Sequence, residues 1–123
     1  MSKIVIIGAG AMGSAFALPC IDNNHDTNII GTHLENEFID NLKKQKNLHP
    51  ALGVQIPKNI NIFKFDKFNE LFKSNVDLIA LGISSKGIEW VSEQLNLISK
   101  DKKLPNILML TKGLSIYENQ YEL

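Results

Sequence analysis

The sequence contains no arginine, because all 13 of its basic residues are lysines. Arginine is the usual partner of phosphate groups, since its planar guanidinium donates to two oxygens at once. Any phosphate that this chain binds must therefore be held without a guanidinium. Net charge is also lacking, because 13 acidic residues balance the 13 lysines, and this argues against nucleic acid or an anionic membrane as a partner. We expect a small molecule or another protein instead.

Long apolar runs and cysteines are scarce as well. The longest apolar stretches, such as residues 78–83, are too short to span a membrane, and the residues before Ile4 lack the layout of a signal peptide. These features predict a soluble cytoplasmic protein. Cys20 is the only cysteine, so no internal disulfide can form, and its place on an apolar helix face predicts a buried structural thiol. His25 and His49 lack partners at metal-ligand spacing, so we expect no metal and assign both to the surface or to loops.

What the chain does have is a regular alternation of short apolar runs and helical patterns. Its 123 residues, 44% of them hydrophobic, suit one domain that buries roughly two thirds of its unfolded surface. Strands are predicted at 3–7, 28–31, 60–65, 76–83 and 106–110, and helices at 11–21, 35–45, 67–73 and about 86–98, with a further helix beginning at 115–121. Pro19 lies inside the first helix and should kink it or end it early.

This alternation predicts an α/β fold. Right-handed crossovers between successive strands give a parallel, doubly wound sheet with the spatial order 3-2-1-4-5. Sheets of this kind bind ligands at the carboxyl ends of their strands, so the functional residues should follow the first, second, fourth and fifth strands.

A complete G-x-G-x-x-G motif follows the first strand and opens the first helix. Its glycines are Gly8, Gly10 and Gly13. In Rossmann-type dinucleotide-binding sheets the first glycine allows a tight turn, the second lets the backbone approach the pyrophosphate, and the third lets helix and strand pack closely. The amides of Ala11 and Met12 then face the anion at the positive end of the helix dipole. The alternative interpretation is a glycine-rich turn without a ligand.

The end of the second strand bears on the choice of cofactor. An acidic residue about twenty positions after the glycines usually accepts hydrogen bonds from the ribose of NAD, but this position falls on His33. Thr32 precedes it, and Glu35 is expected to lie already within the next helix. Thr32 can donate to a phosphate and His33 can stack or donate, so NADP or NAD can bind, with NADP mildly favoured. Alternatively, Thr32 caps a turn and His33 is simply exposed.

Segments spread along the whole chain resemble the NAD(P)-dependent glycerol-3-phosphate dehydrogenases, especially their archaeal-like branch. They are GAGAMGSA at 8–15, GT at 31–32, HPALGV at 49–54, GISS at 82–85 and TKGL at 111–114. The resemblance implies that Ala11, Met12 and Thr32 contact the dinucleotide and that Ser84 lies near the nicotinamide. It also implies that Lys112 reaches both cofactor and substrate and is the catalytic residue of this chain. Without the family, Lys112 is a solvated lysine and Ser84 a helix-capping residue.

The resemblance further implies a reaction, the transfer of hydride between sn-glycerol 3-phosphate and dihydroxyacetone phosphate, in glycerophospholipid metabolism. Family members continue into a helical catalytic domain, so we expect residues 1–123 to be one NAD(P)-binding domain that is inactive alone. The alternatives are a 2-dehydropantoate reductase-like dehydrogenase and a non-catalytic NAD(P)H-sensing module. We also expect a homo-oligomer, formed through an exposed apolar face near Ile83, Leu110 and Leu114.

Overall fold

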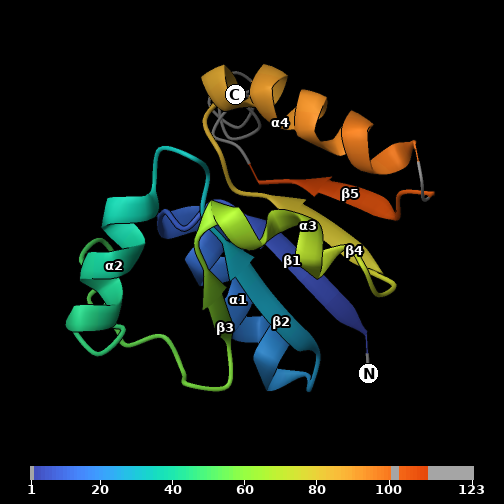
Figure 1. The fold of residues 1–123 in the computed structure, drawn as a ribbon. Coiled ribbons are helices and arrows are strands. Elements are labelled where there is room, and N and C mark those ends of the chain that lie inside the picture. The colour runs from blue at the N-terminus through green and yellow to red at the C-terminus, as the bar shows by residue number, and fades with distance from the viewer. Residues whose placement is uncertain (1, 101–102, 111–123) are drawn as a thin grey trace, which may run out of the picture.

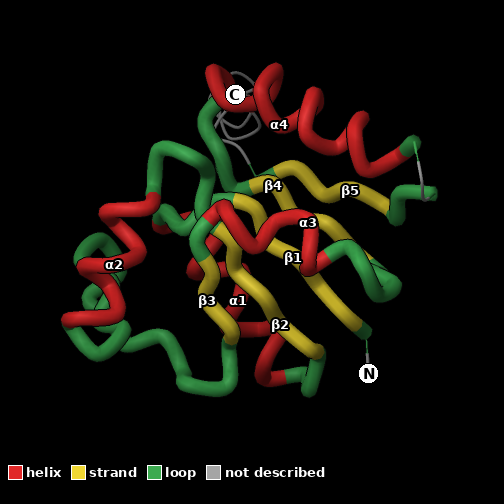
Figure 2. Tube along the Cα trace, in the orientation of Figure 1, coloured by secondary structure: helices red, strands yellow, loops and turns green. Residues whose placement is uncertain are grey.

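The computed structural model describes residues 2–100 and 103–110, and alternates strands with helices throughout this part of the chain (Figures 1 and 2). The strands are β1 (Lys3–Ile7), β2 (Asp26–Ile30), β3 (Asn61–Phe63), β4 (Leu78–Leu81) and β5 (Asn106–Met109). The helices are α1 (Ala11–Asp22), α2 (Asn36–Lys44), the 3-10 turn η1 (Phe65–Lys67), α3 (Phe68–Leu71) and α4 (Ser85–Ser99). The helix expected at 115–121 lies outside the described residues.

The strands form a parallel sheet in the order β3-β2-β1-β4-β5. The central strand, β1, pairs with β2 on one side and β4 on the other, so that Ile7 lies opposite both Ile30 and Leu81. The carboxyl ends of these three strands therefore meet at one edge of the sheet. This is the predicted doubly wound α/β topology, and it places the glycine-rich turn at the point where the strand order reverses.

Two hydrophobic cores cover the two faces of the sheet. On one face, Ile4 and Ile6 of β1 pack with residues of α1 and α2, and on the other face Val5 and Ile7 pack with residues of α3 and α4. Alternating residues of β1 therefore enter different cores, as the period of a strand requires. In Figure 1, α1 accordingly lies behind the sheet and α3 in front of it. This burial on both faces explains why β1 is apolar without alternation.

Helix α1 matches its predicted range of 11–21 to within one residue, and of the two effects expected of Pro19 the early end does not occur. The helix continues through this residue to Asp22, and Pro19 is exposed, so its ring points away from the core. The missing amide hydrogen leaves the carbonyl of Ala15 without its usual helical donor. The carbonyl of Pro19 itself accepts the Asn23 amide at 3.1 Å and the Asn23 side-chain amide at 2.7 Å. The last turn is thus closed by Asn23 beyond the proline.

Strand β2 begins at Asp26, two residues before the predicted start at 28. The prediction began late because polar residues occupy the first half of the strand. Asn28 is almost fully buried, and its side-chain amide donates to the carbonyl of Ile4 at 3.2 Å. Its side-chain oxygen accepts from Asn61 of β3 at 2.9 Å. A polar residue can lie within the sheet here because neighbouring strands satisfy its hydrogen bonds.

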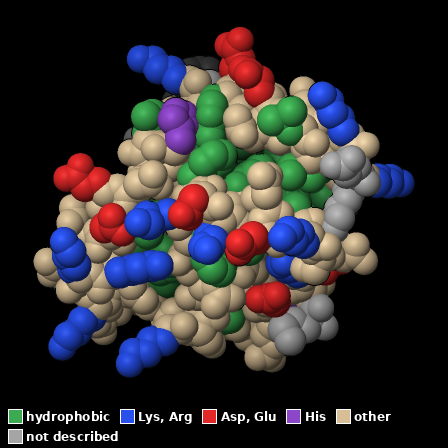
Figure 3. Space-filling model, viewed as in Figure 1, with side chains coloured by type: hydrophobic (Ala, Val, Ile, Leu, Met, Phe, Trp, Pro, Cys, Tyr) green, Lys and Arg blue, Asp and Glu red, His purple; other side chains and the backbone are tan. Residues whose placement is uncertain are grey.

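The surface in Figure 3 shows hydrophobic side chains gathered between α3 and α4, with charged side chains scattered around them. Within the described residues, no helix is long and apolar enough to cross a membrane.

Candidate functional site

The glycine-rich turn after β1 has the geometry that its sequence predicts. Gly8 has φ of 114°, a conformation that L side chains rarely adopt, and its amide donates to the carbonyl of Ile30 at 2.8 Å. A Cβ at Gly8 or at Gly13 would collide with a backbone carbonyl oxygen, that of Gly82 or of Gly8 respectively. These glycines let β1, β4 and the start of α1 approach one another closely.

Gly10 differs from its two partners in the motif. A Cβ built on Gly10 would meet nothing within 4 Å, so the fold does not require glycine there. Gly10 is the N-cap of α1, and its carbonyl accepts the first helical bond, from the Ser14 amide at 3.0 Å. The amides of Ala11 and Met12 precede that bond and have no helical acceptor. Since the first turn of α1 holds no acidic residue, these amides suit an anion such as a pyrophosphate.

The peptide groups of Ala9 are held by side chains from three parts of the chain. The carbonyl oxygen of Ala9 accepts from Ser14 Oγ at 3.0 Å and from His49 Nε2 at 2.9 Å. Its amide donates to Glu35 Oε1 at 3.1 Å. Ala9, Ser14 and His49 are all buried, so these bonds are shielded from water and fix the shape of the glycine-rich turn. We call Ser14, Glu35 and His49 the Ala9 clamp.

His49 lies in a loop, which was one of its two expected positions, but it does not lie at the surface. Its side chain is only 1% exposed, and its ring packs against Phe38 with centroids 5.4 Å apart. The Ala51 amide donates to Nδ1 at 3.2 Å, so the ring proton resides on Nε2 and points at Ala9. The segment HPALGV thus supports the glycine-rich turn, because its first residue, His49, bonds to Ala9.

Glu35 also departs from the sequence analysis, which placed it within the helix after β2 and expected no carboxylate at this corner. Glu35 is instead the N-cap of α2, and its side chain turns back toward the ends of β1 and β2. Besides the Ala9 amide, Oε1 accepts the Thr32 amide at 2.9 Å. A negative charge therefore lies beside the residues that were expected to meet the adenine ribose.

Thr32 and His33 lie just after β2, at the predicted place. Thr32 Oγ1 accepts the Leu34 amide at 3.3 Å, which confirms its turn-capping role and leaves its hydroxyl hydrogen free to donate elsewhere. His33 is exposed, but its ring lies against the Trp90 ring of α4 with centroids 4.5 Å apart. The turn after β2 thus touches the helix after β4 across the carboxyl edge of the sheet.

The remaining predicted site residues follow β4 and β5. Ser84 is exposed and is the N-cap of α4 by position, but its side chain makes no capping hydrogen bond. Lys112 and Leu114 lie outside the described residues. Within the part of the chain that the structure describes, no group of three or more His, Cys, Asp or Glu side chains is placed to hold a metal ion. Cys20 is buried as predicted, and burial raises the pKa of its thiol.

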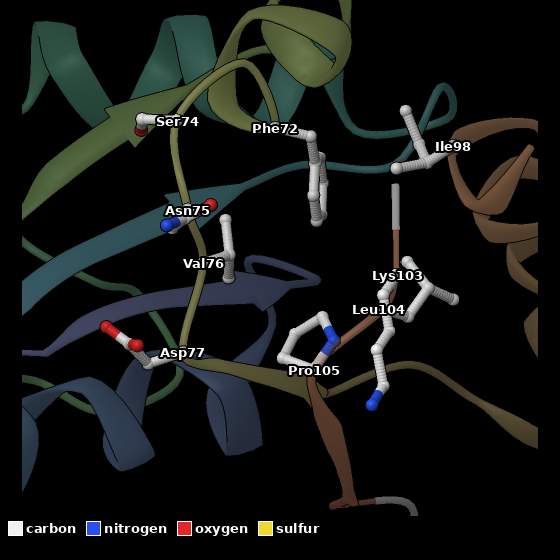
Figure 4. A pocket seen from close by; sticks show the side chains of 9 residues that line it. All are labelled: Phe72, Ser74, Asn75, Val76, Asp77, Ile98, Lys103, Leu104 and Pro105. Carbon is white, nitrogen blue, oxygen red and sulfur yellow. The ribbon is translucent and has the colours of Figure 1, made fainter. Parts of the chain in front are cut away.

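A cavity of about 370 Å³ lies at the other edge of the sheet, beside the amino ends of β4 and β5. In Figure 4 the side chains of Phe72, Val76 and Pro105 point toward a common space, while Asp77 lies to one side. Lys3 closes this end of the molecule, because its amide donates to Asp77 Oδ2 at 2.7 Å and its Nζ donates to the Leu71 carbonyl at 2.7 Å. The cavity is therefore separate from the glycine-rich turn.

The sheet order and the glycine-rich turn together define a Rossmann-like α/β domain of the dinucleotide-binding type. Residues 3–122 match the N-terminal domain of the NAD-dependent glycerol-3-phosphate dehydrogenases. The chain belongs to this family.

Individual relatives agree with this assignment. The NADP(+)-dependent glycerol-3-phosphate dehydrogenase of Archaeoglobus fulgidus is 31% identical over 116 residues, which are 94% of this chain and 33% of that protein. The glycerol-3-phosphate dehydrogenases [NAD(P)+] of Oceanobacillus iheyensis and Bacillus pumilus are 28% and 31% identical, over 93% and 83% of this chain and 31% and 28% of those proteins. The chain thus spans about a third of the length of the curated relatives that it matches.

Sequence reasoning missed Glu35, His49, Ser14, Gly82 and Trp90 as parts of this edge. Ser14 follows the motif directly, and Gly82 follows an apolar strand, so local sequence offered a weak signal for both. Glu35 and His49 reach Ala9 across 26 and 40 positions of the chain, a separation that no local pattern reveals.

Proposed function

We propose that this chain binds NAD(P) at the carboxyl edge of its sheet, as the cofactor domain of a glycerol-3-phosphate dehydrogenase. The observation that supports this best is the pair of amides at Ala11 and Met12, presented by a glycine-rich turn whose shape the Ala9 clamp fixes. An anion can be held there without arginine. Gly10 leaves open space at the same place, so a pyrophosphate can approach the backbone.

The other predicted residues complete this proposal. Gly8 and Gly13 shape the turn, Thr32 and His33 meet the adenosine half of the cofactor, and Ser84 lies on the nicotinamide side. Thr32 and His33 follow β2 while Ser84 follows β4, so the two halves of a dinucleotide would lie on either side of the turn after β1. This is the arrangement in which doubly wound sheets bind dinucleotides.

The choice between NAD and NADP depends on Thr32 and Glu35. The Thr32 hydroxyl can donate to a 2′-phosphate, which supports the mild preference for NADP that the sequence predicts. The second support for that preference, the absence of a carboxylate, is lost because Glu35 lies beside Thr32. We infer that both cofactors bind and that the charge of Glu35 limits the preference for NADP.

The proposed reaction is hydride transfer between sn-glycerol 3-phosphate and dihydroxyacetone phosphate. The nicotinamide carries the hydride when the cofactor is bound. Lys112 is proposed to reach cofactor and substrate from the turn after β5, where a compact positive charge can hold a substrate oxygen. We propose that residues 1–123 act as one NAD(P)-binding domain and that turnover needs the helical second domain that the family resemblance implies.

Calorimetric titration of the chain with NADH and NADPH tests cofactor binding, and nicotinamide absorbance in the presence of dihydroxyacetone phosphate tests turnover. We expect saturable binding of both cofactors and no turnover by the chain alone. Failure to bind either cofactor would overturn the proposed function. Turnover by the pure chain would overturn the requirement for a second domain. If the chain binds cofactor but shows no turnover even when a helical domain of the family is supplied, the NAD(P)H-sensing alternative is favoured.

A further inference from the structure

A row of aromatic rings runs from the core to the carboxyl edge of the sheet. Phe72 contacts Phe68 with ring centroids 5.0 Å apart, Phe68 contacts Phe65 at 5.3 Å, and Phe65 contacts Trp90 at 5.1 Å. The row ends at His33, whose ring lies 4.5 Å from that of Trp90 and is tilted by 37°. Phe68 and Phe72 are buried, Phe65 and Trp90 are half-buried, and His33 is exposed.

The three outer rings come from three different segments of the chain. His33 follows β2, Phe65 follows β3, and Trp90 lies in α4, the helix that follows β4. The glycine-rich turn follows β1, which lies between β2 and β4 in the sheet. His33 and Phe65 therefore lie on the β2 side of the proposed pyrophosphate site, the side on which the adenosine half of a dinucleotide is bound, and Trp90 contacts both of them from α4.

The half-buried indole ring at the outer end of this row suits a purine base. Bases stack on aromatic side chains without needing directed hydrogen bonds, and each stacked ring contributes appreciably to affinity. The indole of Trp90 packs against Phe65, which in turn packs against the buried Phe68, so the position of the indole is supported by the core. The imidazole of His33 covers that face from an exposed turn, so only one solvated side chain has to move to uncover it.

We propose that Trp90 is the adenine-stacking residue of this chain and that the base enters between the Trp90 indole and the His33 imidazole. This inference rests on the proposed function, because it identifies where the adenine of the same dinucleotide is held. The present centroid distance of 4.5 Å is too short for an inserted ring, which needs roughly 7 Å, or twice the contact distance of about 3.5 Å. Binding therefore requires the His33 side chain to rotate outward by a few ångströms.

The composition of the chain makes this proposal directly measurable, since Trp90 is its only tryptophan. Intrinsic tryptophan fluorescence therefore reports the environment of this one ring. We would titrate the chain with AMP, with ADP-ribose and with nicotinamide mononucleotide. AMP and ADP-ribose carry adenine but no nicotinamide, so a loss of fluorescence with both, but not with nicotinamide mononucleotide, is the expected result. Binding of ADP-ribose by calorimetry without any change in Trp90 fluorescence would overturn the proposal.

Variants separate stacking from general stability. Trp90→Phe keeps an aromatic ring, so its affinity for ADP-ribose should stay within about threefold of the wild-type value. Trp90→Leu should lower that affinity by about tenfold or more. His33→Ala, at an exposed position, should weaken it by a smaller factor of about three to five. Leu97→Ala is the matched control, because Leu97 lies in the same helix and is 58% exposed. The ADP-ribose affinity of this variant should equal that of the wild type.

The outcomes also distinguish this proposal from the proposed function. If the wild-type chain binds neither NADH nor ADP-ribose, the proposed function fails. If both bind and folded Trp90→Leu protein retains the wild-type affinity, only the stacking role fails. If Trp90→Leu protein does not fold, as judged by circular dichroism, His33→Ala decides, and an unchanged ADP-ribose affinity in that variant would overturn the proposal.

Discussion

At the scale of single residues, the most informative group is the peptide of Ala9. Its amide and its carbonyl lie beyond the sheet ladder, and the Ala9 clamp satisfies both. Each such bond contributes about 1 kcal/mol to stability, but leaving a buried peptide group without a partner costs more. Because the next residues of the turn supply the amides of Ala11 and Met12, the clamp also fixes the direction of the proposed pyrophosphate donors.

Glu35→Gln tests whether the carboxylate influences cofactor choice. The amide oxygen of glutamine can still accept from the Ala9 and Thr32 amides, so the turn should keep its shape, while the negative charge is removed. A unit charge in a partly solvated corner changes the binding of a nearby phosphate by about 1 kcal/mol. We expect the NADPH affinity to rise about fivefold relative to that of NADH, measured by calorimetry.

Glu35→Ala is the control for that measurement. It removes both hydrogen bonds as well as the charge, so it should weaken both cofactors and lower the melting temperature. If Glu35→Gln leaves the ratio of the two affinities unchanged, the 2′-phosphate does not lie near Thr32, and the proposed orientation of the adenosine half is wrong.

The glycines of the motif offer a second comparison at this scale. Gly13→Ala would place a Cβ against the Gly8 carbonyl, and it should destabilise the chain by about 1 to 3 kcal/mol or more. Gly10→Ala meets no atom within 4 Å, so its melting temperature should stay near that of the wild type. Its Cβ would nevertheless face an approaching pyrophosphate, and NADH affinity should fall about tenfold.

Thermal melts and NADH titrations of both variants check this contrast. Equal stability of Gly13→Ala and Gly10→Ala would contradict the close approach of α1 to the turn. Unchanged NADH affinity in Gly10→Ala would instead contradict the placement of the pyrophosphate.

These residues also show where sequence reasoning succeeds. The roles of Gly8 and Gly13 were predictable because each depends on contacts within a short motif and on the strand before it. The side chains of Glu35 and His49 were misassigned because their positions depend on how α2 and the following loop fold back onto β1. A helix-start pattern near Glu35 could indicate its N-cap position but not the direction of its side chain.

At the scale of elements, the predicted order and type of strands and helices is confirmed, and the differences arise where polar or unusual residues lie inside an element. The start of β2 was predicted two residues late because Asp26 and Thr27 are polar, and it is their pairing with β1 that makes them strand residues. α1 continues past Pro19 because tertiary packing of residues such as Ala17 and Cys20 outweighs a single lost hydrogen bond.

Pro19→Ala tests this account of α1. The alanine restores the amide donor to the Ala15 carbonyl and removes a ring clash, effects worth about 3 kcal/mol in a helix interior. Loss of proline also loosens the unfolded chain, which offsets about 1 kcal/mol of this gain. We expect a net stabilisation of about 1 to 2 kcal/mol, seen by calorimetry as a melting temperature several degrees higher.

Pro19 is exposed and lies at the opposite end of α1 from Gly10, so NADH affinity should serve as an internal control and stay unchanged. A melting temperature equal to or below that of the wild type would show that the helix end is already adapted to proline, with Asn23 closing the last turn at the Pro19 carbonyl.

At the scale of the whole molecule, the expected apolar association face needs correction. Ile83 is only 6% exposed and belongs to the core between the sheet, α3 and α4. Leu110 is half-buried and packs against the other core. The sheet surface that is open instead lies on β5, where Ile107 and Leu108 are 43% and 41% exposed. The predicted strand order already placed β5 at the edge of the sheet, but it did not indicate which of its side chains would be exposed.

This location changes the prediction of self-association into a specific one. An edge strand with exposed apolar side chains presents unpaired backbone groups to another strand, and it promotes pairing between copies. The chain has no net charge to oppose such contact, because 13 acidic residues balance 13 lysines. We therefore expect the chain to form dimers or larger species at micromolar concentration, measured by light scattering, through the edge of β5.

Leu108→Lys should shift that distribution toward the monomer, since a lysine on an edge strand disfavours pairing with a second copy. Leu34→Lys is the matched control: Leu34 is 82% exposed in the turn after β2, so the same change of charge there should leave the size distribution as it was. Equal dissociation by both variants would mean that charge alone, rather than the β5 edge, controls association. A wild-type chain that remains strictly monomeric would show that Ile107 and Leu108 are tolerated at the surface without a partner.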